Sequence, residues 1–508
     1  MTGLPTWAEP LPDAAQQREI DAWAIEERGI PGIELMERAG AGLAELVAEQ
    51  APEGRVAAVC GKGNNGGDGL VVARLLRERG RDVDVLLLAD PDELRGDARA
   101  NLERLPGRPP GPFDPVGLDG AAAIVDAILG TGFSGQPREP AKGAIEAINA
   151  ARDHAVVVAC DAPSGVDAST GEASGAAVHA DATATFHAGK PGLWIAPGKG
   201  LSGEVTVIDI GIPAGPPGQP SVGLIGDRIL ASIPRRGRES TKFAAGAVLI
   251  CGGSLGLTGA PCLASESAMR AGAGYVTALV PASLNLVFEQ RLLEVMSVPL
   301  PDDSGALLAE GADTVLERTA RAGALVLGPG LGRESGSLEL ARTIARRAEI
   351  PLLLDADGLN AHAERLSELA GRPAATVMTP HAGELGRLLG RESSEIEAHR
   401  LASVRRAAAE AQAVVVLKGD DTIVADADGR AAVSRGAASS LATAGTGDVL
   451  SGLIGAYLSK RMDPFEAACA GVLVHARAGR ITARRIGTEG VIARDVIEAL
   501  PEARNADR

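Results

Sequence analysis

Residues 56–79 read VAAVCGKGNNGGDGLVVARLLRER, and this stretch decides the fold of the first half of the chain. A short run of Val and Ala leads into a glycine-rich loop and then into a segment whose apolar residues have helical spacing, which predicts a strand, a loop and a helix. Glycines let the backbone approach a ligand closely, and the first amides of a helix attract anions. The stretch therefore predicts a site for a phosphate-bearing ligand.

The polar residues of this loop strengthen that interpretation. A glycine-rich turn that merely connects a strand to a helix is the simpler alternative, and for a bare Gly-x-Gly pattern it is the better one. Asn64, Asn65 and Asp68 all lie in the loop, and three neighbouring polar side chains are not needed to form a turn. We therefore favour a binding site.

The same alternation of short Val, Ile and Leu runs with longer helical segments continues along the whole chain, which is typical of parallel sheets covered by helices. Each half is thus predicted to be an α/β domain, the first with a Rossmann-like doubly wound sheet. Between Gly211 and Pro220 the sequence reads GIPAGPPGQP, which supports neither helix nor strand. We place the boundary there, between a domain at 1–215 and a domain at 226–508. The predicted strands lie near residues 55–59, 83–88, 124–128, 155–159, 205–209, 248–251, 276–280, 325–327, 352–355, 376–378 and 414–417.

The composition argues against several classes of protein. A formal net charge of −16 disfavours general binding of nucleic acid, and aromatic residues for stacking on bases make up only 2% of the chain. No apolar stretch is long enough to span a membrane, and the first residues lack the pattern of a signal peptide. The five cysteines contain no Cys-x-x-Cys pair, so neither a zinc site nor a disulfide framework is expected. We expect a cytoplasmic protein that binds neither nucleic acid nor membrane.

Two further predicted strands of the first half also end in polar loops. Residues 125–136 read VDAILGTGFSGQ and residues 159–167 read ACDAPSGVD. Ligands of open α/β sheets bind beyond the carboxyl ends of the strands, so these loops and the glycine-rich loop should converge on one cleft. Asp126 and Ser164, taken singly, are as readily explained as structural groups at strand or helix ends. Together with Asn65 they offer an all-oxygen shell for a hard cation.

Several ordered blocks of the first half resemble the N-terminal epimerase domain of the NAD(P)H-hydrate repair family. The resemblance spans residues 16–213, and one departure from the family pattern is Lys62, where the family commonly has Pro. The blocks are QQREIDAWAIEERGIPGIELMERAG (16–40), GKGNNGGDGLVVARLL (61–76), VDAILGTGFSG (125–135), DAPSGVDASTG (161–171) and FHAGKPGL (186–193).

The resemblance implies roles for individual residues. Asp161 would contact the reacting ring, and a carboxylate there suits the proton transfer that epimerisation of a hydroxyl-bearing carbon requires. Asp161→Asn is then expected to abolish exchange between the epimers while leaving folding intact. Potassium would be held by Asn65, Asp126 and Ser164. The hydrated dinucleotide would be held by Asn64, Asn65, Gly66, Gly67, Asp68, Gly130, Thr131, Gly132, Phe133, Ser134, Gly135 and Gln136.

In the second half, polar or small residues again follow the predicted strands. Each cluster lies at the end of a strand or the start of a helix, so one nucleotide site and one acceptor site would use them all. The clusters are GGSLGLTGA (252–260), LGPGLG (327–332), DADGLN (355–360), TPHAGE (379–384), KGDDT (418–422) and AGTGDVLSG (444–452).

The segment AGTGDVLSG is the most informative of these clusters. Its glycines place backbone amides at the start of a helix, where phosphate oxygens are stabilised, and Asp448 lies where an acceptor hydroxyl would lose its proton. The alternative is that Asp448 only complements the helix dipole. His381, considered alone, is more often a structural residue than a catalyst, and Lys418 is equally compatible with a surface charge or a phosphate contact.

This ordered set resembles the ribokinase-like superfamily and, more specifically, the ADP-dependent NAD(P)H-hydrate dehydratase, over residues 238–498. The resemblance implies a ribokinase-like α/β/α domain that uses ADP and Mg²⁺. Residues Thr241–Phe243 stand where the family usually has His-Lys-Gly. The residues implied to contact the hydrate are Ala260, Gly332, His381 and Asp448. Those implied to contact the adenine nucleotide are Lys418, Gly419, Asp420, Asp421, Thr422 and Gly447.

The combined hypothesis is repair of the hydrates NADHX and NADPHX. The first half would interconvert the R and S epimers, and the second would dehydrate the S epimer at the expense of ADP, releasing AMP and phosphate. One alternative is a ribokinase-like vitamin or sugar kinase with an accessory nucleotide-binding domain. Another is a protein whose first half binds a nucleotide without turning it over. The sequence leaves a homo-oligomer open.

Overall fold

The structure is a computed structural model that describes residues 3–238 and 241–505. The chain divides into two compact units, each described separately below. One unit runs from Pro10 to Val222, and the other contains the residues up to Glu9 together with those from Gly223 onward. This division differs from the predicted domains 1–215 and 226–508 in placing the first residues of the chain with the C-terminal unit.

The N-terminal unit is built on a seven-stranded sheet in which all neighbouring strands are parallel. The strand order is β4-β3-β2-β5-β6-β7-β8. The chain runs outward in one direction from β2 and in the other from β5, so the switch point of the doubly wound sheet lies between these two strands. The strands are β2 (Val56–Cys60), β3 (Val83–Leu87), β4 (Gly111–Pro112), β5 (Ala123–Ala127), β6 (Val156–Cys160), β7 (Ala182–Phe186) and β8 (Glu204–Ile208).

Helices cover both faces of this sheet. Apolar residues of α1, α2 and α3 form one buried cluster with Val56, Ala58 and Val125, whereas α5 packs in a second cluster with Val59 and Ile124. Alternate residues of the same strands enter the two clusters, as expected for a sheet that is buried on both faces. The helices are α1 (Ala14–Glu26), α2 (Gly32–Gln50), α3 (Asn64–Glu78), α4 (Gly96–Glu103), α5 (Ala141–Ala151) and α6 (Gly198–Leu201).

The C-terminal unit contains an eleven-stranded sheet of order β1-β9-β20-β19-β18-β17-β16-β15-β10-β11-β12. The strands from β18 to β12 in this order are parallel, while β19 is antiparallel to both of its neighbours. These strands are β1 (Ala8–Pro10), β9 (Val222–Ile225), β10 (Ala247–Cys251), β11 (Tyr275–Pro281), β12 (Met296–Leu300), β15 (Ala324–Leu327), β16 (Leu352–Leu354), β17 (Thr376–Met378), β18 (Val414–Leu417), β19 (Ile423–Ala425) and β20 (Ala431–Val433), and a separate hairpin is formed by β13 (Asp302–Asp303) and β14 (Ala306–Leu307).

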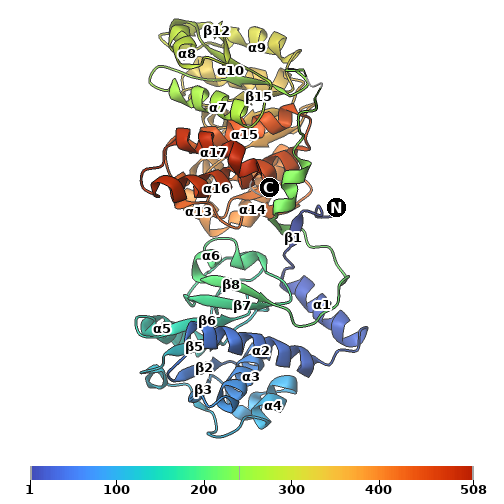
Figure 1. Cartoon of the computed structure of the whole chain (residues 1–508), viewed down its shortest axis with the longest axis vertical. Helices are drawn as coiled ribbons and strands as arrows, with labels where there is room; N and C mark the ends of the chain where they lie inside the picture. The colour runs from blue at the N-terminus through green and yellow to red at the C-terminus, as the bar shows by residue number, and fades with distance from the viewer. Residues whose placement is uncertain (1–2, 239–240, 506–508) are drawn as a thin grey trace. The chain divides into compact units, whose positions relative to one another are not determined.

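The helices of the C-terminal unit bury most of its apolar side chains. Figure 1 labels α7, α14, α15, α16 and α17 in the C-terminal unit. Residues of α7, α15, α16 and α17 form one large cluster with Val326, Leu353 and Val416 of the sheet, while α14 contacts β18 and contributes no residue to that cluster. The helices are α7 (Gly259–Arg270), α8 (Asn285–Arg291), α9 (Ala312–Thr319), α10 (Ser335–Arg347), α11 (Asp357–Asn360), α12 (Ala382–Leu389), α13 (Ser393–Ala398), α14 (Arg400–Ala411), α15 (Thr446–Ser459), α16 (Pro464–Ile486) and α17 (Ala493–Asn505).

The predicted fold class of two α/β domains is confirmed, and each predicted strand lies within about one residue of an observed one. The strands that the sequence analysis missed are either very short or, like β7 with its sequence ATATF, lack a run of large apolar side chains. The five cysteines are buried free thiols, as expected. Among the described residues, no helix is both long and apolar enough to span a membrane.

Candidate active sites

A cavity of about 880 Å³ lies in the N-terminal unit at the switch point of its sheet. Its lining comes from the loops after β2, β5 and β6 and from α1, which confirms the convergence that the sequence predicted. A cavity of this volume lies within the usual range for small-molecule sites. The predicted binding residues in its lining are Asn64, Asn65, Asp68, Gly130, Thr131, Gly132, Phe133 and Asp161.

The remaining predicted residues of these loops lie behind or beyond the lining. Gly66 is buried where an added Cβ atom would stand 1.9 Å from the Gly61 carbonyl oxygen, so only glycine fits there. Gly67 packs in the same way against Met36. Ser134, Gly135 and Gln136 are not among the lining residues. The two inner glycines thus shape the loop, while its asparagines and aspartate face the cavity.

Asp161 is held at the cavity by a buried lysine. Lys190, which is almost fully buried, lies with Nζ 2.7 Å from Asp161 Oδ1, and the Thr131 hydroxyl donates a hydrogen bond to Oδ2. Although burial acts to raise the pKa of Asp161, Lys190 and the hydrogen bonds lower it below its ordinary value. The residue adopts φ = +63°, a conformation that Asp tolerates better than most residues and that is common at functional sites. Asp161 is therefore a fixed carboxylate.

The three predicted potassium ligands lie around one short segment. The hydroxyl of Ser164 donates to Asp126 Oδ1 at 2.6 Å, its Oγ accepts a hydrogen bond from the Leu129 amide, and Asn65 Nδ2 donates to the Leu129 carbonyl oxygen at 3.1 Å. Asp126 and Ser164 are fully buried. Burial raises the pKa of Asp126 to about 6, against the hydrogen bonds from Ser164, which lower it. The side chains of Asp126 and Ser164 thus contact each other, and Asn65 and Ser164 both bond to the backbone of Leu129.

The predicted loops of the C-terminal unit also meet at the carboxyl ends of its strands. The Gly253 amide bonds to the Pro329 carbonyl oxygen, and the Ser254 hydroxyl donates to the carbonyl of Gly330, which joins the loops after β10 and β15. The Cβ atom of Ala260, in the first turn of α7, lies close to Gly330, and Gly332 donates its amide to Asp357 in the loop after β16. Ala260 and Gly332 therefore border the same region.

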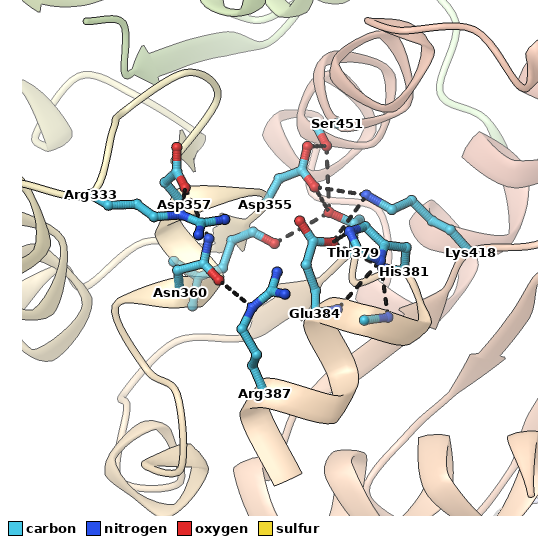
Figure 2. A network of polar contacts seen from close by, with 12 residues as sticks. Arg333, Asp355, Asp357, Asn360, Thr379, His381, Glu384, Arg387, Lys418 and Ser451 are labelled. Atoms are coloured by element: carbon cyan, nitrogen blue, oxygen red, sulfur yellow. Dashed lines mark hydrogen bonds and ion pairs between the residues drawn. The ribbon is translucent and has the colours of Figure 1, made fainter. Parts of the chain in front are cut away.

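Asp355 is the centre of a network that joins the ends of two further strands to helices α12 and α15 (Figure 2). Thr379 after β17 and Ser451 of α15 each donate a hydrogen bond to its carboxylate at 2.8 Å. Lys418 Nζ lies 3.2 Å from Asp355 and 3.6 Å from Glu384. Asp355 therefore holds Lys418 in place. The sequence was equally compatible with a surface charge and a phosphate contact, and the structure shows this lysine bound to two carboxylates at the strand ends.

Asp448 lies in the first turn of α15, beside this network. Burial and, to a lesser extent, the charge of Asp355 raise its pKa to about 7, although Lys418 acts in the opposite direction. Gly447, the neighbouring residue, would place an added Cβ atom 3.6 Å from Lys418 Nζ. A carboxyl group with a pKa near neutrality can exchange a proton with a substrate hydroxyl, so Asp448 has the properties of a general base.

His381 caps helix α12. Its Nδ1 accepts a hydrogen bond from the Gly383 amide at 3.0 Å, and Glu384 in return accepts one from the His381 amide. The ring is about half exposed, and burial, together with the charges of Lys418 and Arg387, lowers its pKa despite Glu384. The ring is thus half-exposed, with its Nδ1 bound by the first amides of α12.

The KGDDT loop is closed by its own side chains. Asp421 forms a buried ion pair of 2.8 Å with Arg400, Thr422 donates to the Gly419 carbonyl oxygen, and Asp420 accepts the amide of Ala437. These bonds hold the backbone of the loop in place next to Lys418. The side chains of Asp420, Asp421 and Thr422 thus hold the loop in place, and their predicted contact with the nucleotide stays a prediction.

Comparison with known proteins agrees with this pair of sites. A family model described as NAD(P)H-hydrate dehydratase matches residues 248–502, and one described as YjeF-related protein N-terminus matches residues 32–192. The bifunctional NAD(P)H-hydrate repair enzyme of Moorella thermoacetica is 40% identical over 97% of this chain and 96% of its own length. The enzyme of that name from Escherichia coli is 35% identical over 95% and 92%, respectively.

The chain belongs to the family of bifunctional NAD(P)H-hydrate repair enzymes. Among solved structures, an ADP/ATP-dependent NAD(P)H-hydrate dehydratase from Bacillus subtilis, co-crystallised with ATP and Mg²⁺, matches with a TM-score of 0.48 and 27% identity. That match covers 55% of this chain and 96% of the other. The repair-enzyme relatives, by contrast, match both units of this chain along nearly their whole length.

Residues Thr241–Phe243, which replace the usual His-Lys-Gly of the repair enzymes, lie at the opposite end of the strands from the site. Lys242 Nζ stands 5.0 Å from the ring centroid of Tyr275, the first residue of β11, and 5.4 Å from that of Phe243. The Lys242 carbonyl oxygen lies against Gly274. The segment thus packs against the amino ends of β10 and β11.

Two glycines of the repair enzyme's first loop offer a matched pair of variants. Gly66→Ala would drive Cβ into the Gly61 carbonyl, whereas Gly63→Ala would place Cβ where nothing lies within 4 Å. We expect Gly66→Ala to destabilise the N-terminal unit by about 2 kcal/mol. For Gly63→Ala we expect a loss of less than ~1 kcal/mol. Thermal unfolding of the full chain measures both, and equal losses would contradict the close approach at Gly66.

Sequence reasoning missed four residues of these sites. Lys190 stood in the block FHAGKPGL and Asp355 in DADGLN, but neither was assigned a role. A lysine in an otherwise apolar block and an aspartate directly after a strand were the available signals. Thr379 and Ser451 gave no signal, because hydroxyl residues at helix and strand ends are common.

Proposed function

We propose that the N-terminal unit epimerises the hydrates NADHX and NADPHX, and that the C-terminal unit dehydrates the S epimer with ADP, releasing AMP and phosphate. The observation that carries the proposal is the presence of two separate sites, each with a carboxyl group suited to one of the two steps. Asp161 lines the first site as a fixed carboxylate, and Asp448 lies in the second with a pKa near neutrality.

In the epimerase unit, the residues around the cavity divide into two groups. The amides at the start of α3 suit the phosphates of the dinucleotide, because helix N-termini attract anions. Asp161, fixed by Lys190 and Thr131, suits the reacting ring. The polar side chains of Asn64 and Asn65 would orient the ligand between these two ends.

Asn65, Asp126 and Ser164 would hold a potassium ion. Asp126 is fully buried, and its carboxylate accepts hydrogen bonds from neutral groups, the hydroxyl and amide of Ser164 and the amide of Ile128, so a cation would balance its charge. The oxygen atoms of an amide, a carboxylate and a hydroxyl suit a hard cation. A bound potassium ion would supply positive charge beside the Leu129–Gly130 segment that lines the cavity.

In the dehydratase unit, Asp448 would accept the proton of the ring hydroxyl as that oxygen takes up a phosphoryl group. Hydroxide is a poor leaving group, so the phosphorylated oxygen would then leave as phosphate and restore the ring double bond. Lys418 and the amides of Gly445–Gly447 would stabilise the phosphate charge. Ala260, Gly332 and His381 would contact the hydrate, and residues 418–422 would contact ADP.

The same site fits a nucleotide-bound magnesium ion. Among the residues that the structure describes, Lys418 is the ammonium group close to Asp355, Glu384 and Asp448, so the site has excess negative charge. Within residues 3–238 and 241–505, no three acidic, His or Cys side chains are arranged to hold a metal alone. Magnesium commonly uses one or two carboxylates with substrate phosphates and water, and it would neutralise phosphate charge here.

Product analysis tests the proposal against the kinase alternative. The purified chain is incubated with the S epimer of hydrated NADH, Mg²⁺ and either ADP or ATP, and with pyridoxal or hydroxymethylpyrimidine in parallel. We expect reduced dinucleotide, AMP and phosphate to form in equal amounts with ADP. A phosphorylated vitamin or sugar, with the hydrate unchanged, would identify a kinase instead.

A further inference from the structure

Asp68 is a nearly buried carboxyl group with few partners in the N-terminal cavity. It lines the cavity together with Asp161 but is only 7% exposed. In the part of the chain that the structure describes, its carboxyl receives one weak hydrogen bond, from Cys160 Sγ at 4.0 Å. Asp161, by contrast, is bound by an ammonium group and by hydroxyl and amide donors. Asp68 and Asp161 thus line the same cavity but differ in their surroundings, because Asp161 has several strong donors and Asp68, among the described residues, has one weak donor.

The charges around Asp68 set its protonation state. Burial raises its pKa well above the ordinary value, and the carboxylates of Asp161 after β6 and Asp21 on α1 raise it further, while Lys190 acts in the opposite direction. The remaining titratable neighbours are the thiols of Cys60 and Cys160, whose pKa values are themselves raised by burial. Asp68 therefore holds its proton more tightly than an ordinary carboxyl group, whereas Asp161 holds its proton less tightly.

A protonated and an ionised carboxyl group in one site form a common acid–base arrangement, because each can act only in the direction its proton allows. Epimerisation at a hydroxyl-bearing carbon next to a ring nitrogen needs such a pair. The hydroxyl must gain a proton to leave as water, and the incoming water must lose one. A carboxylate alone supplies only the second of these steps.

We propose that Asp68 is the proton donor of the epimerisation and acts with Asp161 as an acid–base pair. The inference rests on the proposed epimerase function. Asp68 gives its proton to the ring hydroxyl, the carbon–oxygen bond breaks with loss of water, and the ring nitrogen lone pair forms a carbon–nitrogen double bond. Water then adds to the opposite face, the double bond electrons return to nitrogen, and Asp161 accepts the released proton. Exchange with cavity water returns that proton to Asp68 between turnovers.

Variants of Asp68 in the full chain test this role. Asp68→Asn keeps the size and removes the acid, so we expect epimer exchange to fall about 10²- to 10⁴-fold, with the dissociation constant for hydrated NADH changed by less than about threefold. Asp68→Glu should restore part of the rate. ADP-driven dehydration of the S epimer by the same molecules serves as the internal control. Exchange at the wild-type rate, or a loss explained by weaker binding alone, would overturn the proposal.

The pH profile supplies a second test that leaves Asp68 in place. Exchange requires protonated Asp68, so its rate should fall as pH rises through the pKa of that group. Asp21→Asn removes a negative charge that raises this pKa, and the fall should move to lower pH. If the rate of exchange fell at the same pH in Asp21→Asn as in wild type, the role of Asp68 would be contradicted. Wild-type protein that exchanges no epimers would instead refute the proposed function itself.

Discussion

Asp448→Asn is expected to lower the rate of ADP-driven dehydration by about 10²- to 10⁴-fold, while epimer exchange stays at the wild-type rate. Asparagine matches aspartate in size but cannot accept the proton of the ring hydroxyl. Spectroscopic measurement of reduced dinucleotide from the S epimer gives the first rate, and separation of the epimers gives the second. Normal dehydration by the variant would show that another residue is the base.

The pH dependence of dehydration provides a further check on Asp448. A general base acts when ionised, so the wild-type rate should rise with pH through about 7, the value to which burial raises the pKa of Asp448. Because this folded-state pKa lies above the ordinary value of 3.8, the stability that the group contributes at low pH is lost as pH rises through about 7. Asp448→Asn should therefore unfold no more easily than wild type at neutral pH, which separates a chemical from a structural effect.

Asp161→Asn is expected to reduce epimer exchange by a similar factor of about 10² to 10⁴. The expectation that folding stays intact needs correction, because the variant leaves the ammonium of Lys190 buried without its carboxylate. Removing one partner of a buried ion pair costs about 3–5 kcal/mol. Thermal unfolding should therefore show a lower melting temperature for the N-terminal unit.

The double variant Asp161→Asn with Lys190→Met separates the two effects of this substitution. It removes both charges while keeping similar volumes, so stability should recover relative to Asp161→Asn alone. Exchange should remain lost. If epimer exchange returned together with stability, Asp161 would be a structural residue, and the proposal that it contacts the reacting ring would be wrong.

The fold was predictable because each strand that positions a site is a short apolar run followed by a glycine-rich or polar loop. The strands β2, β5 and β6 placed their loops at one cavity for that reason, and the parallel strands from β10 to β18 did the same in the second unit. The pairing of β1 with β9 was not predictable, since three residues carry too little periodicity to assign.

The sequence predicted which loops form the sites, but not which side chains within them form ion pairs. Motif reading found Asp161 and Lys418, yet their partners Lys190 and Asp355 lie 29 and 63 residues away. Spacing within a motif cannot reveal a partner that only the folded sheet brings near. The same limit applies to Asp421, whose carboxylate looked available for a nucleotide but is bound to Arg400.

A chain that performs both repair steps must consume both epimers of the hydrate. Purified protein is mixed with both epimers of hydrated NADH, ADP and Mg²⁺, and the return of reduced-nicotinamide absorbance is followed to completion. We predict that both epimers are consumed, with the R epimer lost at the rate at which it is exchanged into the S form. Consumption of the S epimer alone, with the R epimer left unchanged, would contradict the account.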